Sequence, residues 1–189
     1  MNRRQFLGGT IVAAAGAGLV AWPKRPIAIM ARSAPPRGDE VVTVVRFSDA
    51  GEKLGPEKVK KVYKSDAEWQ KQLNALQFQV TRQQGTEPAF TGEYAESTDQ
   101  GLYRCVCCHN ALFSSDTKFD SGTGWPSFWA PIAKENVQGS RDSSLAMTRD
   151  EVHCTECEGH LGHVFDDGPR PTGLRYCMNS AALRFVKHG

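Results

Sequence analysis

The stretch LYRCVCC (residues 102–108) joins a run of apolar and aromatic residues to two cysteines spaced C-x-x-C. A second pair with this spacing, CTEC (residues 154–157), follows after 45 intervening residues. Two such pairs supply four thiolates, which is the ligand set of a closed tetrahedral zinc site. We therefore predict one structural Zn²⁺ per chain that clamps two distant segments. Its ligands would be Cys105, Cys108, Cys154 and Cys157.

The same cysteines allow a second interpretation. In an oxidising compartment, six cysteines could instead form two or three disulfides. Paired C-x-x-C spacing is a familiar metal geometry, whereas six cysteines allow many disulfide pairings, so the pattern favours zinc. Only Cys108 has the required spacing from Cys105, which leaves Cys107 unassigned. His109 and His153 flank the pairs, and we expect supporting or surface positions for them, with His109 as an alternative ligand.

Short apolar stretches alternate with Gly, Pro, Asp and Ser clusters through the rest of the chain after residue 85. This pattern predicts antiparallel strands in a mainly β (α+β) domain, built as a small barrel or two sheets with about one or two helices and a structural zinc site. The expected strands cover residues 102–106, 128–132, 164–165, 174–178 and 183–186.

The segment before residue 85 combines helical and extended patterns. SDAE (residues 65–68) has the form of a capping box, and apolar residues then recur at helical spacing. We expect one amphipathic helix there, with Trp69, Leu73, Leu76 and Val80 along its apolar face and with the aromatic and leucine side chains in the core. Upstream, residues 34–39 read as a linker, 41–47 as a strand, 49–56 as a turn and 58–64 as a weaker strand.

The N-terminus has the pattern of an export signal. Residues 1–5 are short and positive, residues 6–22 are uncharged and apolar, and small residues follow near 31–34. The adjacent Arg3 and Arg4, followed by Gln5-Phe6-Leu7, resemble a twin-arginine signal. We predict a twin-arginine signal peptide over residues 1–33 and a periplasmic address. The alternative is an uncleaved leader that anchors the chain in the membrane, although 17 residues fall short of the roughly 20 that a spanning helix needs.

Composition excludes several classes of protein. At 189 residues and 40% apolar content, the chain can form one domain with a core, and its glycines and prolines have no collagen-like period. Residues 1–33 hold five basic side chains and no acid, so the remainder has 18 basic and 21 acidic side chains, a formal charge of −3. Bulk charge therefore argues against a nucleic-acid partner.

The sixth cysteine, Cys177, stands apart in the predicted strand LRYCMN (residues 174–179). Side chains alternate along a strand, so Arg175, Cys177 and Asn179 should share one face, about 6.7 Å between neighbours. A guanidinium beside a thiol favours the thiolate, which is the reactive form. A lone cysteine is commonly an inert core residue, but this neighbourhood points to chemistry.

Two further segments carry candidate site residues. GWPSFW (residues 124–129) places large aromatics, including Trp125 and Phe128, in a stretch punctuated by Gly and Pro. HLGH (residues 160–163) offers two imidazoles suited to proton transfer. Residues three apart face opposite sides of a regular strand, so His160 and His163 can share a site only if Gly162 allows a bend or bulge.

Several of these motifs together resemble the type B methionine-R-sulfoxide reductases, from about residue 65 to 186. The motifs are GTEPAFTGEY (85–94), YRC (103–105), FDSG (119–122), GWPSF (124–128), HLGHVF (160–165) and RYCMNS (175–180). The resemblance implies a largely antiparallel β domain over residues 65–189, preceded by a linker and strands over 34–64. It matches the family's zinc ligands to the four paired cysteines and its nucleophile to Cys177. Its substrate-site residues match Trp125, His160, His163, Arg175 and Asn179, and we add Phe128 as a substrate contact.

The resemblance also implies a mechanism. Cys177 attacks the sulfur of the R epimer of methionine sulfoxide, free or in a protein, and is left as a sulfenic acid. The two histidines and Asn179 would hold and protonate the sulfoxide oxygen, and Trp125 would form an apolar wall for the methyl group.

The chain departs from the family at one position. Many members carry a resolving cysteine where this sequence has Thr123. We therefore expect an external thioredoxin-like protein or small thiol to reduce the sulfenic acid, with Cys107 as a substitute resolving residue only as an alternative. A zinc-stabilised binding module without catalysis and a secreted disulfide scaffold are the rival interpretations.

Overall fold

The computed structural model of this chain describes residues 39–142 and 149–188. The signal predicted for residues 1–33 lies outside the described residues, as does most of the predicted linker. Among the helices that the structure describes, none is both long enough and apolar enough to cross a membrane.

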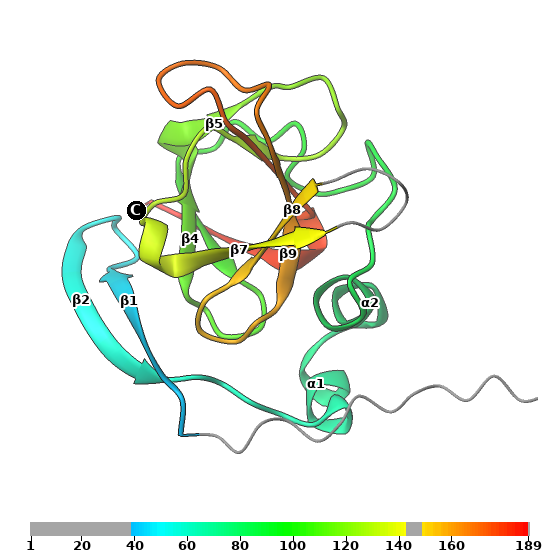
Figure 1. Ribbon diagram of the computed structural model, residues 1–189. Coiled ribbons are helices and arrows are strands. Elements are labelled where there is room, and N and C mark those ends of the chain that lie inside the picture. Colours follow the sequence, from blue (N-terminus) through cyan, green and yellow to red (C-terminus); the bar gives the residue numbers. More distant parts are fainter. Residues whose placement is uncertain (1–38, 143–148, 189) are drawn as a thin grey trace, which may run out of the picture. The chain divides into compact units, whose positions relative to one another are not determined.

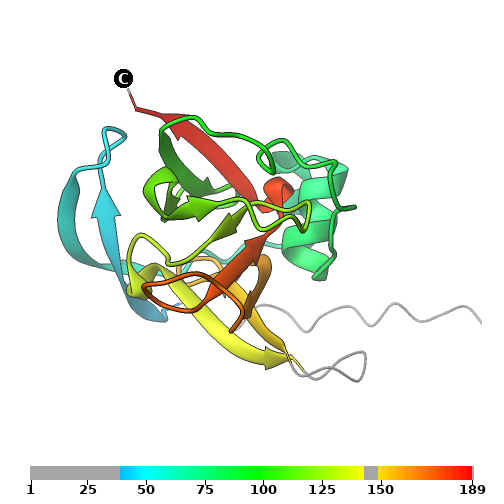
Figure 2. The same cartoon turned by 90° about the horizontal axis from the view of Figure 1, so that it is seen from above.

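Two antiparallel sheets form the body of the domain (Figures 1 and 2). The larger contains, in spatial order, β5 (Lys118–Phe119), β6 (Ser127–Phe128), β10 (Arg175–Met178), β9 (His160–Phe165), β8 (Arg149–Cys154) and β7 (Val137–Asp142). The smaller contains β11 (Leu183–Lys187), β3 (Gly101–Cys105) and β4 (Ala111–Ser114). Short 3-10 turns lie at η1 (Ser115–Thr117), η2 (Lys134–Asn136) and η4 (Ser180–Ala182). The predicted mainly β, antiparallel fold class is confirmed.

An aromatic cluster joins the two sheets in the core. The ring of Phe128 stacks on Phe113 with centroids 4.5 Å apart and meets Tyr103 edge-on at 5.0 Å. All three side chains are fully buried. Such pairs add about 0.5–1.5 kcal/mol each beyond the burial of apolar area. The apolar stretches seen in the sequence therefore meet in the core, and Phe128, which we expected at the substrate, packs there.

The prediction of a single helix before residue 85 is wrong. The structure has two helices, α1 (Asp66–Gln72) and α2 (Ala75–Gln83), and Leu73 between them has an extended backbone. A second capping box causes the break, because the side chain of Asn74 accepts from Gln77 N while Gln77 caps the Asn74 backbone in return.

The break also changes which side chains reach the core. Trp69 and Val80 are fully buried and Leu73 nearly so, as the helical spacing predicted. Leu76 is 44% exposed, contrary to prediction, because the extended backbone at Leu73 and Asn74 interrupts the helical spacing that placed Leu76 with the other apolar residues. Phe78 takes a core position on α2 instead.

An N-terminal hairpin of β1 (Val41–Phe47) and β2 (Lys53–Lys60) packs beside the sheets (blue to cyan in Figure 1). The predicted strand at 41–47 is confirmed, whereas the second strand begins earlier than expected and ends at Lys60. Asn136 fastens the hairpin: its amide accepts from Val45 N at 2.7 Å and donates to Val45 O at 2.8 Å.

Candidate functional site

Four of the six cysteines gather into one cluster. The Sγ atoms of Cys105, Cys108, Cys154 and Cys157 lie within 4.8 Å of one another. Cys105 and Cys157 are 3.6 Å apart and Cys108 and Cys154 are 3.5 Å apart, far beyond the roughly 2.05 Å of a disulfide. A tetrahedral zinc site with Zn–S bonds of about 2.3 Å needs sulfurs about 3.8 Å apart. The four thiols therefore fit one metal ion, as predicted, and the disulfide interpretation is not supported.

Two similar turns present these thiols. In the first, His109 N donates to Cys105 O at 2.9 Å, and in the second, Glu158 N donates to Cys154 O at 2.9 Å. His109 and Glu158 both have positive φ, which closes each turn just after its second cysteine. His109 is therefore an exposed turn residue, outside the group of ligand atoms that the described residues bring together.

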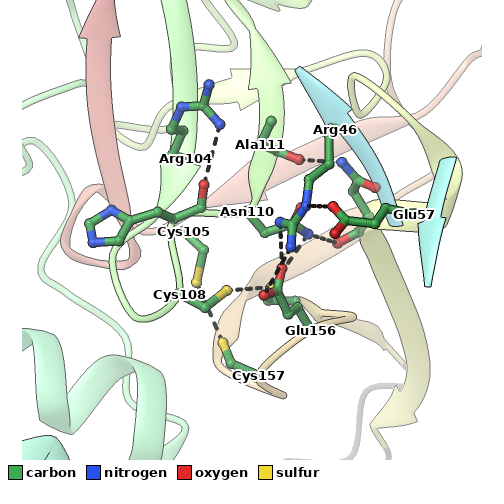
Figure 3. Close-up of polar contacts among 12 residues, drawn as sticks. Arg46, Glu57, Arg104, Cys105, Cys108, Asn110, Ala111, Glu156 and Cys157 are labelled. Atoms are coloured by element: carbon green, nitrogen blue, oxygen red, sulfur yellow. Dashed lines mark hydrogen bonds and ion pairs between the residues drawn. The ribbon is translucent and has the colours of Figure 1, made fainter. Parts of the chain in front are cut away.

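Charged and amide side chains surround the cluster (Figure 3). Glu156, inside the second cysteine turn, accepts from Arg46 Nη1 at 2.9 Å, and Arg46 Nε reaches Glu57 of the hairpin at 2.7 Å. Burial raises the pKa of Glu156, while Arg46 opposes that shift. Asn110 Nδ2 points at Cys154 Sγ, 3.8 Å away. The N-terminal hairpin thus makes a direct ion pair with one of the cysteine turns.

Cys177 lies elsewhere, on β10, at the wall of a separate small cavity of about 90 Å³. The cavity brings together four of the residues singled out in the sequence, and the lining set is Thr86, Trp125, Gly162, His163, Phe165, Cys177, Met178 and Asn179. Phe128 is absent from this lining and His160 stands behind it.

Arg175 is held next to the sulfur by an acidic partner that sequence reasoning missed. It donates to both oxygens of Asp167, at 2.8 and 2.7 Å, and stacks 4.3 Å from the ring of Phe165. The hydrogen bonds to Asp167 raise the pKa of Arg175, and the sulfur of Cys177 adds to that rise. The guanidinium is therefore a fixed positive charge near Cys177, as its place on the strand predicted.

The two histidines come together because β9 is irregular. Pairing between β8 and β9 shifts register at Val152 and His153, and the rings of His160 and His163 lie 5.4 Å apart. Gly162 is required between them, since a Cβ there would lie 2.2 Å from Cys177 O. The bulge that the sequence argument needed is present.

The environments of the two imidazoles differ. His160 is 2% exposed, and its Nδ1 lies 2.7 Å from Glu151 Oε1. Burial lowers the pKa of His160, and Glu151 opposes that shift. His163 lines the cavity. His163 is thus the imidazole placed to reach a bound molecule, with His160 and Glu151 behind it.

Glu87 supports two residues of the cavity wall, Asn179 and Trp125, and was not singled out from the sequence. Its carboxylate, 2% exposed, accepts from Ser180 N at 2.6 Å and from Ala181 N at 2.9 Å. Its backbone N–H donates to Asn179 Oδ1, and its carbonyl accepts from Trp125 Nε1 at 3.0 Å. Glu87 therefore sets the orientation of two residues that line the cavity.

Comparison with known proteins identifies the family. The SelR domain matches residues 73–187. The chain belongs to the SelR domain family. It is 58% identical over 125 residues to "Peptide methionine sulfoxide reductase MsrB" of Hahella chejuensis, covering 66% of this chain and 90% of that protein. A protein of the same name from Leptospira interrogans is 56% identical over 126 residues, covering 67% of this chain and 96% of the relative. The residues that match the SelR domain, 73–187, include both the cysteine cluster and the lining of the Cys177 cavity.

Proposed function

We propose that this chain is a peptide-methionine (R)-S-oxide reductase in which Cys177 is the nucleophile. The observation that carries the proposal is the separation of the cysteines: four thiols are gathered in a closed cluster, while Cys177 lines an open cavity with Trp125, His163 and Asn179. The curated names of the relatives support the reaction. The same separation favours an enzyme over a binding module, which would not need the second site.

The proposed reaction reduces the sulfoxide and oxidises Cys177. The thiolate of Cys177 attacks the sulfoxide sulfur and forms an S–S bond, while the S–O bond breaks and the protonated oxygen leaves as water. Water then attacks the Cys177 sulfur, the S–S bond breaks, and methionine leaves with its sulfur reduced by two electrons. The Cys177 sulfur is oxidised by two electrons and becomes a sulfenic acid. Protonation of the sulfoxide oxygen makes it a better leaving group, and His163 is the acid placed to supply that proton.

The fixed side chains of the cavity would select and orient the substrate. The indole of Trp125 is held by its hydrogen bond to Glu87 O and offers an apolar wall for the methyl group. An epimer with oxygen and methyl exchanged would place oxygen against that wall, without a hydrogen-bond donor. Asn179 is held by two hydrogen bonds, from Glu87 N and to Leu161 O, so its remaining N–H has a defined direction.

The four clustered cysteines would bind Zn²⁺. With four protein thiolates the ion has no open position, so its role would be structural. Metal analysis of the purified protein tests this assignment, with one equivalent of zinc per chain expected.

Turnover of separated R and S epimers, with dithiothreitol as reductant, tests the catalytic proposal. Wild type should reduce the R epimer alone, and Cys177→Ser should lose the activity, while Cys107→Ala, which removes a thiol outside the cavity, should retain it. Undiminished turnover by Cys177→Ser would overturn the proposal.

For regeneration we propose an external thioredoxin-like protein or small thiol, because Thr123 occupies the position next to the nucleophile. Two reductant thiols would convert the sulfenic acid back to the thiol, releasing one disulfide and one water. One equivalent of methionine sulfoxide should leave a sulfenic acid that dimedone traps. A mass two hydrogen atoms lower than that of the reduced protein, with a Cys107–Cys177 link, would instead identify Cys107 as the resolving residue.

We also propose export to the periplasm by the twin-arginine route, on the sequence pattern of residues 1–33. Replacing Arg3 and Arg4 with lysine should leave the chain in the cytoplasmic fraction. Normal export of that variant would contradict the assignment.

A further inference from the structure

Three hydroxyl groups form a row that ends at the sulfur of Cys177. The Oγ atoms of Ser127 and Ser121 are 2.7 Å apart, and Ser121 Oγ is 2.8 Å from Thr123 Oγ1. Thr123 Oγ1 is in turn 3.8 Å from Cys177 Sγ, within the range of a hydrogen bond to sulfur. Ser127 is fully buried and directly opposite Cys177 in the pairing of β6 with β10. Its Oγ also lies 3.2 Å from the carbonyl oxygen of Trp125.

The row is built on backbone that has little freedom. Gly122 N donates to Asp120 Oδ1 at 2.8 Å, and Gly124 O accepts from Phe90 N at 2.8 Å. Both glycines have positive φ, and a Cβ on Gly124 would lie 2.7 Å from Phe90 N. Thr123, between them, is therefore held at a fixed distance from the sulfur.

Each hydroxyl has one proton, so the row has two consistent orientations. When Cys177 is a thiol, its S–H can point to Thr123, Thr123 to Ser121, Ser121 to Ser127, and Ser127 to the Trp125 carbonyl. When Cys177 is a thiolate, every proton can turn round: Ser127 donates to Ser121, Ser121 to Thr123, and Thr123 to the sulfur. The proton lost by Cys177 leaves for solvent through the cavity, and the three hydroxyls keep their own protons.

The hydrogen bonds of the two orientations differ in strength. The thiolate orientation gives up the bond to the Trp125 carbonyl and gains a charge-assisted hydrogen bond to sulfur. Hydrogen bonds to a charged partner are roughly twice as strong as neutral ones, and a chain of donors reinforces each member. The row should therefore favour the thiolate over the thiol.

We propose that Thr123 is a catalytic residue that donates a hydrogen bond to the Cys177 thiolate, with Ser121 and Ser127 as positioning residues that aim and reinforce that donor. The inference rests on the proposed function, in which Cys177 is the nucleophile. It gives Thr123 a role of its own, stabilisation of the attacking thiolate, in addition to its occupying the place of the resolving cysteine.

Alkylation of Cys177 by iodoacetamide as a function of pH, quantified on the Cys177 peptide by mass spectrometry, tests the proposal. Thr123→Val keeps the shape of the side chain and removes the hydroxyl. The pH at which the alkylation rate is half its maximum should therefore rise by about one unit, which means about tenfold less thiolate at pH values well below that midpoint. Thr123→Ser keeps the hydroxyl and should stay near wild type. Ser121→Ala, which leaves Thr123 in place, should move the midpoint in the same direction by a smaller amount.

The outcomes separate this inference from the function on which it rests. Unshifted alkylation midpoints in Thr123→Val and Ser121→Ala, with melting temperatures and metal content like wild type, would overturn the proposed role of Thr123. The proposed reductase function would not be affected. If Thr123→Val does not fold, the Ser121→Ala midpoint decides alone. Full R-epimer turnover by Cys177→Ser would instead refute the function.

Discussion

The cysteine cluster and the Cys177 cavity place the same side chain in two opposite environments. In the cluster, each sulfur faces three others, and Cys105, Cys154 and Cys157 are at most 1% exposed. In the cavity, the single sulfur of Cys177 faces a hydroxyl, a guanidinium and open space. Tight turns hold the clustered thiols, whereas a regular strand presents Cys177. Local backbone thus separates the four thiols that could hold a metal ion, which lie at the ends of β3 and β8 and in the turns that follow, from the thiol on β10 that lines the cavity.

The largest expected effect is on the stability of the fold, which should depend on the cysteines of the cluster and not on Cys177. Cys154→Ser removes one ligand from the proposed zinc site, where a structural metal would contribute about 10–16 kcal/mol of binding free energy, comparable to the whole stability of a domain. We expect the variant to lose the bound metal, measured by metal analysis, and to lose cooperative thermal unfolding, measured by calorimetry. Cys177→Ser should keep the metal and melt within about 2 °C of wild type. A folded Cys154→Ser protein would show that the cluster does not support the fold.

The second prediction concerns the support of the open cavity. Glu87→Gln replaces the buried carboxylate that accepts from Ser180 N and Ala181 N. An amide offers one oxygen for two donors, so we expect about 2–4 kcal/mol lower free energy of unfolding by denaturant titration. We also expect about 10- to 100-fold lower kcat/KM, because Asn179 and Trp125 both depend on the position of Glu87.

The exposed Glu96→Gln is the matched control, since it removes a carboxylate without a buried partner. Glu87→Gln activity equal to that of this control would mean that Asn179 and Trp125 are positioned without Glu87.

Features that depend on neighbouring residues could be predicted from the sequence. The apolar stretches gave β3, β10, β11 and part of β9, but not β4, β5, β7 or β8, and the stretch at 128–132 is in a strand only at Phe128. The spacing of the cysteine pairs gave the cluster. The break between α1 and α2 was missed because apolar spacing runs through it, although Asn74 and Gln77 have capping-box spacing. The core position of Phe128 was missed because it depends on sheet register: Ser127 pairs with Cys177, so the next side chain on β6 turns to the core.

Features that depend on distant segments could not be predicted. The bond from Glu87 N to Asn179 joins residues 92 apart, and Ser180 N reaches Glu87 across 93 residues. Glu151 and Asp167 likewise carry no motif that assigns them to His160 and Arg175. A single carboxylate in a sequence does not show its partner until the sheet register brings the two together.

A smaller effect is expected where the N-terminal hairpin meets the cluster. Arg46→Gln breaks the contacts with Glu156 and Glu57 and leaves the buried Glu156 without its cation. We expect metal release to a chelator to be about 3- to 10-fold faster, measured by the colour of the metal–chelator complex, since one such contact is worth about 1 kcal/mol. Lys60→Gln, which breaks an exposed ion pair with Asp39 in the same hairpin, should release metal at the wild-type rate. Equal rates in the two variants would mean that the hairpin does not brace the cluster.

The smallest expected effect is a pH dependence that originates beside the cavity. Burial lowers the pKa of His160 in the folded protein, while the unfolded chain has the ordinary value near 6.5. Between these values the unfolded chain binds more protons, so the stabilising contribution is present above about pH 6.5 and is lost as the pH falls. His160→Gln should therefore flatten the fall in unfolding free energy on the acid side, by less than about 1.4 kcal/mol per pH unit, the limit for one proton.

The exposed His109→Asn is the control for that measurement, because asparagine tolerates the positive φ at this position. Denaturant titrations from pH 5 to 8 should show the wild-type slope in His109→Asn and a shallower slope in His160→Gln. An identical slope in all three proteins would show that His160 takes up its proton equally in the folded and unfolded chain, and the partly buried Glu151 carboxylate would then fully offset the cost of burial. In that case the imidazole behind His163 would be charged in the folded protein only below about pH 6.5, as in the unfolded chain, and burial would not set its protonation state.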